Sequence, residues 1–498
     1  MWYIIGVSKD TPILWEKLLD RQAFDQLTRD QIFSLFELLV PFVARCEKLE
    51  RRVEVLEKDN EELKRRLNQN SQNSSKPPSS DPPGSKPAPK KGPSGKKPGG
   101  QPGHQANFRA PFPEKRVDEQ LEVVPERCKH CDKALKGQGR NPRRHQVAEL
   151  PPIHVRVVEY LLYTLKCRYC GHTTRAKLPE GISPRLMGPR LTALTVLLSG
   201  AFRMSKREVQ AFLKSFLDLD IALGTVSKCE KAASEALQPC VDEALEYARA
   251  QGAANVDETG WKQARKLAWL WTMVTPSVTV FKLQARRNAE AMKELLGSFM
   301  GTLTSDRFGA YNAFKGVRQL CWAHLMRDFE AFRAMRGRPG HIGKQLQGWT
   351  WKVFQLWHKV RDGTLSRRKF NKRLPYYQRH IIALMKQGAE MTHGTSVSRT
   401  CRRILKAKKA LWTFTKLKGV EPTNNAAERA LRPAVLWRKG SFGTHGESGR
   451  IFAENILTVR ATLKKQGRDL YGFLIQACQA NLGGAKIPSL LPSANKRS

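Results

Sequence analysis

The sequence is short of acids, of cysteines and of long apolar runs, and each shortage excludes a class of protein. Its 498 residues hold 45 Asp and Glu against 87 Lys and Arg. Ten cysteines are too few for a disulfide scaffold. No stretch approaches the roughly 20 apolar residues of a membrane-spanning helix, and the N-terminal MWYIIGV lacks the basic lead of a signal peptide. We therefore expect a cytoplasmic protein in a reducing setting, with no membrane partner.

Positive charge is present in excess, with a formal net charge of +42. A field of this sign concentrates polyanions, so nucleic acid is the expected partner, and an acidic membrane surface is the alternative. Apolar residues make up 40% of the chain, enough for at least one sizeable core. The length predicts two to four structural units.

A heptad pattern near the N-terminus predicts a parallel coiled coil. The d positions are Phe42, Leu49, Leu56 and Leu63, and the a positions are Cys46, Val53, Asn60 and Leu67. A stripe with a 3.5-residue period is typical of a coiled coil, and a buried Asn at one a position favours a dimer in a single register. The alternative is a lone amphipathic helix that packs on its own domain.

The next segment is a basic linker, and a metal-binding module follows it. Of the 30 residues from Ser74 to Gly103, nine are Pro, six Gly, six Ser and six Lys, a composition that cannot form a core. Two CxxC pairs then enclose strand-like stretches such as IHVRVVEYLLYTLKC; their cysteines are Cys128, Cys131, Cys167 and Cys170. Four thiolates suit one structural Zn²⁺ in a zinc-ribbon-like module, although a redox pair or chance remains an alternative.

Residues 186–250 show helical periodicity. The run MSKREVQAFLKSFLDLDIALGTVSKCEKAA predicts a capped helix, a turn at Gly224 and a second helix that begins at Thr225. This order is similar to a helix-turn-helix, in which Ser227, Lys228 and Lys231 would face DNA. A purely structural helical hairpin is an equal alternative.

The central part of the chain predicts a ribonuclease-H-like fold. An apolar run ends on Asp257, two more strand-like runs and a helix follow, and a further apolar strand ends on Asp306. If the first and fourth strands are parallel neighbours, these two acids meet. A later helix, NNAAERALRP, adds Glu428 one turn after a capping Asn424 or Asn425. Three carboxylates in one place require a cation, and two Mg²⁺ or Mn²⁺ ions would suit phosphoryl transfer.

Several long motifs indicate a family. They are NSSKPPSSD, KPGGQPGHQ, the paired CxxC sequences, VDETGW, SDRFGAY, CWAHLMRDF, NNAAERALRP and WRKGSFGT. From about Leu49 to the C-terminus the chain resembles the transposases of the insertion sequence 66 family. The resemblance implies a DDE-type recombinase of bacterial origin, nucleoid-associated when bound, in which Asp257, Asp306 and Glu428 are the catalytic acids. It also implies a helical insertion between the second Asp and the Glu.

The fold class expected is therefore multidomain α/β, with a ribonuclease-H-like DDE catalytic domain. The expected parts are an atypical extension (1–36), a coiled coil (37–70), a linker (71–115), a zinc module (116–185), a helix-turn-helix-like segment (186–250), the catalytic domain (251–330 and 421–475), a basic helical insertion (331–420) and a C-terminal tail (476–498).

The insertion is strongly basic, with 22 Lys and Arg against two acids between Ala331 and Val420. This imbalance favours a segment that follows DNA phosphates. Its Trp349, Trp351, Phe354 and Trp357 are expected to form a core more readily than a base-stacking platform.

Four further side chains are candidate DNA contacts: His324, Arg432, Arg438 and Lys439. His324 is a candidate contact to the scissile phosphate; with Cys321 it could also ligate zinc, or simply pack beside the site. Arg438 and Lys439 follow the Glu428 helix and would hold DNA near the metals, or form a solvated basic turn.

The function expected is metal-dependent cleavage and strand transfer at the terminal inverted repeats of the chain's own element, acting on double-stranded DNA and a target. We expect a homodimer or larger assembly, with accessory proteins of the same element as possible partners. One alternative is an inactive zinc-containing DNA-binding regulator. Another is a nuclease that selects branched DNA by its shape.

Overall fold

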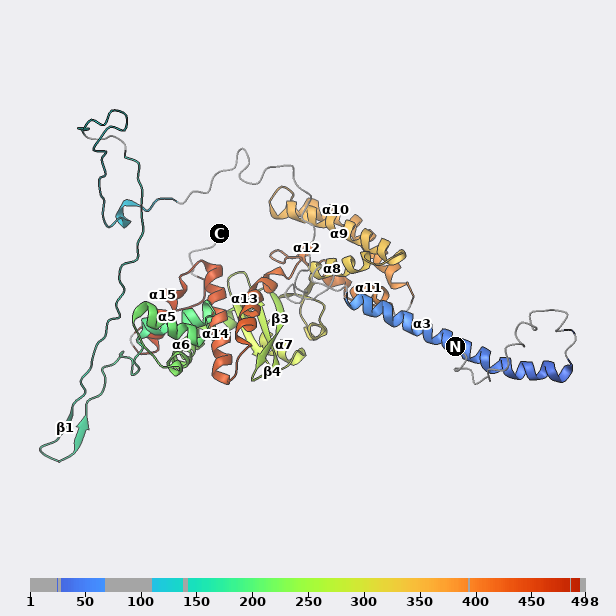
Figure 1. Cartoon of the computed structure of the whole chain (residues 1–498), viewed down its shortest axis with the longest axis horizontal. Helices are drawn as coiled ribbons and strands as arrows, with labels where there is room; N and C mark the ends of the chain where they lie inside the picture. The colour runs from blue at the N-terminus through green and yellow to red at the C-terminus, as the bar shows by residue number, and fades with distance from the viewer. Residues whose placement is uncertain are drawn as a thin grey trace. The chain divides into compact units, whose positions relative to one another are not determined.

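The fold comes from a computed structural model (Figure 1). It describes residues 25, 28–67, 110–137, 142–392, 395–483 and 485–492. The chain divides into two compact units, Met1–Ser85 and Lys86–Ser498. Most of the predicted N-terminal extension and nearly all of the predicted linker fall outside the described residues.

The first unit is described as one long helix, α3 (Arg29–Leu67). The helix begins eight residues before the predicted start of the coiled coil at residue 37. Four of its heptad side chains are about half exposed: Phe42 at 47%, Leu49 at 54%, Val53 at 51% and Leu56 at 58%. In a coiled coil, a stripe of this kind is buried against a second helix. A second copy of α3 would cover these half-exposed side chains, and this dimer remains a prediction.

The segment from residue 110 to 185 has little regular structure among its described residues. Its elements are the 3₁₀ turn η3 (Glu114–Arg116) and an antiparallel pair, β1 (Thr164–Lys166) and β2 (Thr173–Arg175). The long strand-like stretch expected before Cys167 therefore shortens to three residues. Its apolar side chains, such as Leu161 and Tyr163, are mostly exposed.

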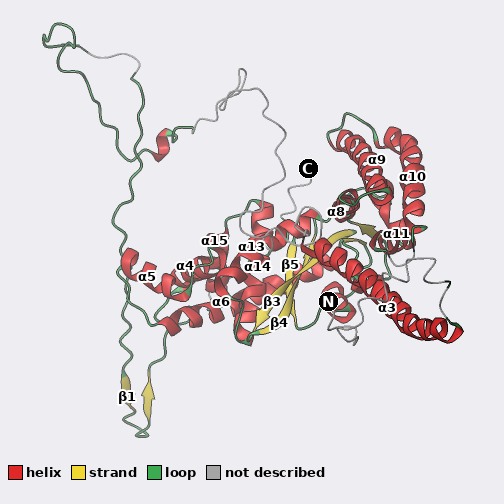
Figure 2. Cartoon of the chain, turned by 45° about the vertical axis from the view of Figure 1, so that its right-hand side comes forward, coloured by secondary structure: helices red, strands yellow, loops and turns green. Residues whose placement is uncertain are grey.

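A five-stranded mixed sheet forms the centre of the second unit (Figure 2). The strands are β3 (Ala253–Gln263), β4 (Lys266–Val274), β5 (Thr279–Gln284), β6 (Thr302–Ser305) and β7 (Arg318–Leu320). Their spatial order is β5-β4-β3-β6-β7, with β3, β4 and β5 antiparallel. β3 runs parallel to β6, and β6 to β7. Helix α7 (Ala289–Leu296) joins β5 to β6. The parallel pairing of β3 with β6 confirms the expected pairing of the first and fourth strands. This mixed α/β arrangement is consistent with a ribonuclease-H-like domain.

β3 is longer than the sequence pattern indicates. The apolar run was expected to end at Asp257, but the strand continues to Gln263 and pairs with β4 from Asn255 to Gln263. Its end is also held by the loop after α13 (Asn425–Ser441), where the backbone N–H of Thr444 donates to the Lys262 oxygen and the Thr444 oxygen accepts the N–H of Ala264. A Cβ on Gly443 would lie 2.1 Å from the Lys262 carbonyl oxygen, so this close docking requires glycine.

Helices that precede the strands in the sequence and helices that follow them share one core with the sheet. Helix α6 (Leu223–Arg249), α14 (Glu447–Gln466) and α15 (Leu470–Ala480) bury apolar side chains with those of β3 and β4. Within residues 186–250, Ala193, Val196 and the buried side of α6 thus belong to the core of the sheet. Part of the expected C-terminal tail also belongs to this core, because Ala477, Cys478 and Leu490 are buried in it.

Helix α14 protects the free edge of β5. Its side chains accept the outward backbone N–H groups of alternate β5 residues: Thr279 binds Thr462, Phe281 binds Thr458 and Leu283 binds Glu454, at 2.9–3.1 Å. Acceptors four residues apart on a helix face match donors two residues apart on a strand. The edge is therefore closed to pairing with another chain.

The expected helical hairpin forms with a shifted turn. Helix α5 (Lys206–Leu217) begins with a capping box between Ser205 and Glu208. It ends at Asp218 in the left-handed conformation, and α6 begins at Leu223. The turn thus precedes Gly224 and Thr225, which lie in the first turn of α6.

The insertion is helical and has its own core. Helix α8 (Trp322–Arg333) leads into it and shares its core. The insertion itself contains α9 (Arg338–Arg361), α10 (Arg367–Ala389), α11 (Ser396–Lys406), the 3₁₀ turn η6 (Lys408–Leu411) and α12 (Thr413–Lys416). Trp357 is buried and Trp349 and Phe354 pack against this core, as expected, whereas Trp351 is 58% exposed. None of the helices that the structure describes is long and apolar enough to cross a bilayer.

Candidate active site

Asp257 and Asp306 lie at the same level on two neighbouring parallel strands. The last paired residues of β3 and β6 are Asn255 and Thr304, and each aspartate stands two residues beyond its strand's member of that pair. Asp257 is inside β3, and Asp306 directly follows β6. The carboxylate of Asp306 accepts the backbone N–H of Phe308 at 2.9 Å, which fixes its orientation.

Glu428 joins the two aspartates from the first turn of α13. The residue that places this turn is Asn424, which is completely buried. Its amide donates to the backbone oxygen of Val256 at 2.9 Å, and its side-chain oxygen accepts from Asn255 at 3.1 Å. The side chain thus does not cap α13, as the sequence suggested, but attaches the helix start to the strand that carries Asp257.

The pKa of Asp257 responds to burial and to the acids around it. Burial raises the pKa of the Asp257 carboxyl well above its ordinary value. The negative charges of Glu258, Asp306 and Glu428 raise this pKa further. A carboxylate in this position is costly unless a cation neutralises the group.

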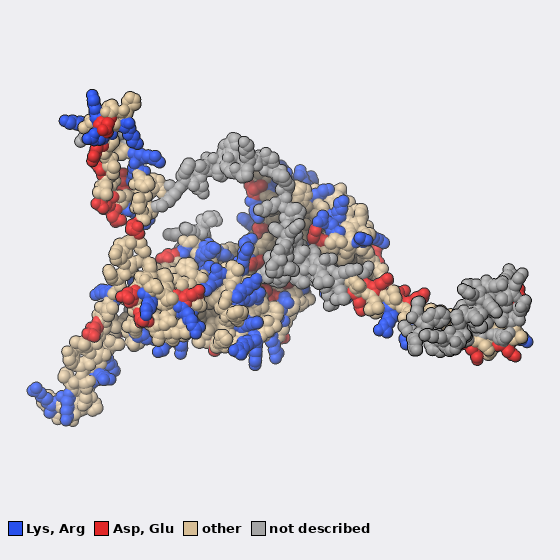
Figure 3. All heavy atoms as spheres, viewed as in Figure 1, with Lys and Arg blue, Asp and Glu red and all other residues tan. Residues whose placement is uncertain are grey.

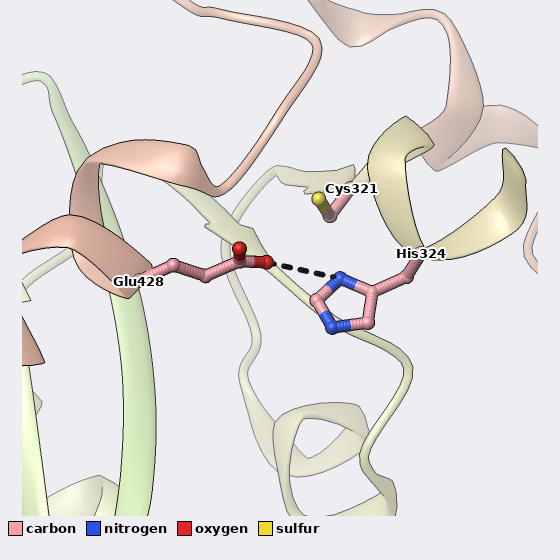
Figure 4. Close-up of side chains that lie close together, drawn as sticks. All are labelled: Cys321, His324 and Glu428. Carbon is pink, nitrogen blue, oxygen red and sulfur yellow. Dashed lines mark ion pairs between the residues drawn. The ribbon is translucent and has the colours of Figure 1, made fainter. Parts of the chain in front are cut away.

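Two side chains of α8 flank Glu428, and one of them, His324, is drawn in Figure 4. Nδ1 of His324 lies 3.7 Å from Oε1 of Glu428, and Nη2 of Arg327 lies 3.5 Å from Oε2. Oε1 of Glu428 is buried and has no hydrogen-bond partner among the described residues. An unpaired carboxylate oxygen beside two further acids is the donor set that a hard divalent cation takes.

A fourth acid, Glu258, lies next to the three, and protein groups pair with both of its carboxylate oxygens. Glu258 is buried and forms an ion pair with Arg287 at 2.7 Å. Its other oxygen accepts the hydroxyl of Tyr311, and the Arg287 guanidinium lies over the Phe308 ring. This network was missed in the sequence, where only the adjacency of Glu258 to Asp257 could have indicated it. It supports the loop that carries Asp306.

The two CxxC pairs form matching turns. Cys128 donates its N–H to Lys133 and accepts from Asp132, and Cys167 makes the same contacts with His172 and Gly171, at 2.8–3.0 Å. Hydrogen bonds from following residues, led by the backbone N–H of Cys131 and of Cys170, lower the pKa of the Cys128 and Cys167 thiols. Such turns are ready to present thiolates to a metal. However, the four sulfurs do not form one cluster in the described part of the chain, where the ligand group found is Cys321, His324 and Glu428.

The predicted DNA contacts lie in different settings. Lys228 and Lys231 are exposed on α6, and Arg432 and Lys439 are exposed on α13. Arg438 is half-buried and its guanidinium donates to Thr259 at 3.1 Å and to the backbone oxygen of Gly260. Part of Arg438 therefore holds β3, a role that the sequence did not indicate.

Comparison with known proteins gives the family. A model described as "Transposase IS66 family" matches residues 185–450, more than half of the chain and all three acids. The chain belongs to the IS66 family of transposases. It is thus a DDE-type, phosphoryl-transfer enzyme of DNA transposition, and membership implies DNA binding and a divalent metal.

Other matches add less about function. Residues 23–110 match a family of unknown function. Two uncharacterized proteins of Sinorhizobium fredii (strain NBRC 101917 / NGR234), y4qI and y4hP, are each 24% identical to this IS66-family chain. The alignments cover 77% and 78% of the chain, and 78% and 77% of the relatives.

Proposed function

We propose that this transposase cleaves DNA strands at the ends of its own insertion sequence and joins them to a target. In this proposal Asp257, Asp306 and Glu428 are the ligands of two Mg²⁺ or Mn²⁺ ions. The observation that carries it is the placement of Asp257 and Asp306 at one level of two adjacent parallel strands, with Glu428 close enough to raise the pKa of Asp257. Ions held by these three acids would activate the attacking water or 3′-hydroxyl and would stabilise the leaving oxygen.

The chain's own groups orient these ligands and hold the DNA. Asn424 attaches the start of the Glu428 helix to β3, and the Phe308 N–H fixes the carboxylate of Asp306. The DNA phosphates would be bound by the basic insertion and by Lys228, Lys231, Arg432 and Lys439, with His324 and Arg438 beside the acids. On the face drawn in Figure 3, basic side chains outnumber acidic ones over the helices of the insertion. Such contacts give affinity without reading the base sequence.

The decisive experiment replaces each acid by its amide: Asp257→Asn, Asp306→Asn and Glu428→Gln. Each change should abolish nicking of a DNA fragment that carries the element's end, in Mg²⁺ or Mn²⁺, because two acids cannot hold both ions in line. Binding of the same fragment should persist and fall steeply with salt in all four proteins.

The matched control is Glu258→Gln, a change of a neighbouring acid that is already paired with Arg287 and hydrogen-bonded by Tyr311. It should retain measurable nicking. Near-normal nicking by Asp306→Asn would contradict the DDE assignment. Wild-type protein that binds the ends but never nicks them would favour the inactive regulator, and nicking confined to branched DNA would favour the structure-selective nuclease.

A further inference from the structure

A second type of metal site lies beside the acids, at the junction of α8 and α13. The Cys321 sulfur, a His324 ring nitrogen and a Glu428 oxygen all lie within 4.8 Å of one another (Figure 4). Cys321 immediately precedes α8, so a one-turn spacing brings Cys321 and His324 to the same side. Sulfur and imidazole ligands select Zn²⁺ and similar ions and are poor ligands for Mg²⁺.

The cluster contains two buried polar atoms that lack hydrogen bonds. Nδ1 of His324 and Oε1 of Glu428 are 3.7 Å apart, and neither has a hydrogen-bond partner among the residues described. Buried polar atoms without partners are rare and need an explanation. Two ligands of a tetrahedral Zn²⁺, each at ~2.0–2.1 Å, are about 3.4 Å apart. One ion between these two atoms would satisfy both with a small adjustment.

The third ligand is held in place by the backbone. The sulfur of Cys321 accepts the N–H of Asn424 at 3.0 Å, so it faces the start of the helix that carries Glu428. Three protein ligands and one open position are the usual set of an accessible zinc site.

We propose that Cys321, His324 and Glu428 bind a thiophilic divalent cation such as Zn²⁺, and that this ion withdraws Glu428 from the DDE acids and stops strand cleavage. On binding, the Cys321 thiol loses its proton to solvent and forms a sulfur–metal bond. The inhibitory part of this inference rests on the proposed catalytic role of Glu428, whereas the binding part does not.

The binding test counts Co²⁺ ions, which report thiolate ligation by their absorption, in full-length wild type, Cys321→Ser and His324→Asn. All three proteins keep both CxxC pairs, so any metal at those pairs cancels in the comparison. Each variant should bind one Co²⁺ per chain fewer than wild type, and Cys321→Ser should lose part of the sulfur-to-cobalt absorption.

The matched control is Cys240→Ser. Cys240 is also buried, but its thiol donates to the Pro488 oxygen at 2.9 Å, a bond that a serine hydroxyl retains. This control should bind as many ions as wild type. His324→Asn covers the case in which Cys321→Ser does not fold, because the His324 Nδ1 atom makes no hydrogen bond that would be lost.

The inhibition test measures Mg²⁺-dependent nicking at rising Zn²⁺ concentration. Loss of one ligand should raise the half-inhibiting Zn²⁺ concentration at least about tenfold relative to wild type. Equal Co²⁺ counts in wild type and both variants would overturn the metal site, and equal inhibition curves would overturn its regulatory role. Failure of the DDE proposal would appear separately, as nicking by Glu428→Gln without added Zn²⁺.

Discussion

At the scale of the residue, Asn424 decides where Glu428 lies. The hydrogen bonds of its side-chain amide with Val256 and Asn255 link the start of α13 to β3 beside Asp257. Asn424→Ala should lower the nicking rate by about 10²-fold, because a displacement of ~1 Å in a catalytic group has an effect of that size. Asn424 is a positioning residue, so raising the Mn²⁺ concentration should restore part of the rate by holding Glu428 through the metal.

A buried asparagine elsewhere provides the control for this prediction. Asn455 also uses its amide for two hydrogen bonds, to Ser234 and Gln238, at 3.0–3.1 Å. Asn455→Ala should lower the thermal midpoint about as much as Asn424→Ala does. The folded Asn455→Ala protein should nevertheless nick DNA at a near-normal rate. If the two variants lose the same activity, the effect of Asn424 is on stability alone.

The sequence predicted that the three acids lie close together, but it did not predict which groups hold them in place. Asp257 and Asp306 follow from the order of strands, because parallel neighbours place equivalent residues side by side. The bond from Asn424 to Val256 spans 168 positions of the chain, and nothing local distinguishes it from an ordinary helix cap. The same holds for Arg438, whose contact with β3 depends on how α13 crosses the sheet.

At the scale of the element, α14 replaces the missing neighbour of β5. Thr458 is fully buried and accepts the Phe281 N–H at 3.0 Å. Thr458→Val keeps the side chain's volume and leaves that N–H without a partner, which should lower the free energy of unfolding by about 1–3 kcal/mol. Thermal or urea unfolding measures it.

The same substitution at Thr350 is a matched control. Thr350 is also fully buried, but its hydroxyl has no hydrogen-bond partner in the described structure. Thr350→Val should therefore be neutral or stabilising, since it removes an unsatisfied polar group. Equal losses at the two positions would mean that the hydroxyl of Thr458 contributes little to the β5 edge.

The CxxC turns make a prediction about metal content. If Cys128, Cys131, Cys167 and Cys170 share one ion, protein purified in a Cys321→Ser background should retain about one Zn²⁺ per chain. Cys167→Ser in that background should lose this zinc and unfold the module locally, while the catalytic unit keeps its thermal transition. Metal analysis that finds no zinc in the Cys321→Ser protein would refute the shared site.

Element boundaries were predicted less well than element types, for physical reasons. The hairpin turn lies before Gly224 because α5 already ends at Asp218, which adopts the left-handed conformation. Residues 476–498 were expected to be a tail, yet Leu490 is buried in one core with side chains of α6 and α14. Burial of single apolar side chains in an irregular segment has no periodicity, so no sequence pattern could indicate it.

At the scale of the whole molecule, an assembly of chains would place several active sites on one piece of DNA. In the second unit, α14 closes the β5 edge of the sheet to pairing with another copy. The first unit does, because α3 presents apolar side chains at heptad spacing with half of their surface exposed. We therefore expect assembly to depend on α3.

A peptide that spans α3 should be helical and dimeric, as measured by circular dichroism and sedimentation equilibrium. Asn60 occupies an a position, where paired Asn side chains favour two parallel helices in one register at the expense of stability. Asn60→Ile should thus raise the thermal midpoint of the peptide and allow trimers or tetramers to form. Glu54→Ile adds the same side chain at an outer position of the heptad and should leave the dimer unchanged. A wild-type peptide that remains monomeric at high concentration would contradict the coiled coil, and assembly would then have to depend on DNA rather than on α3.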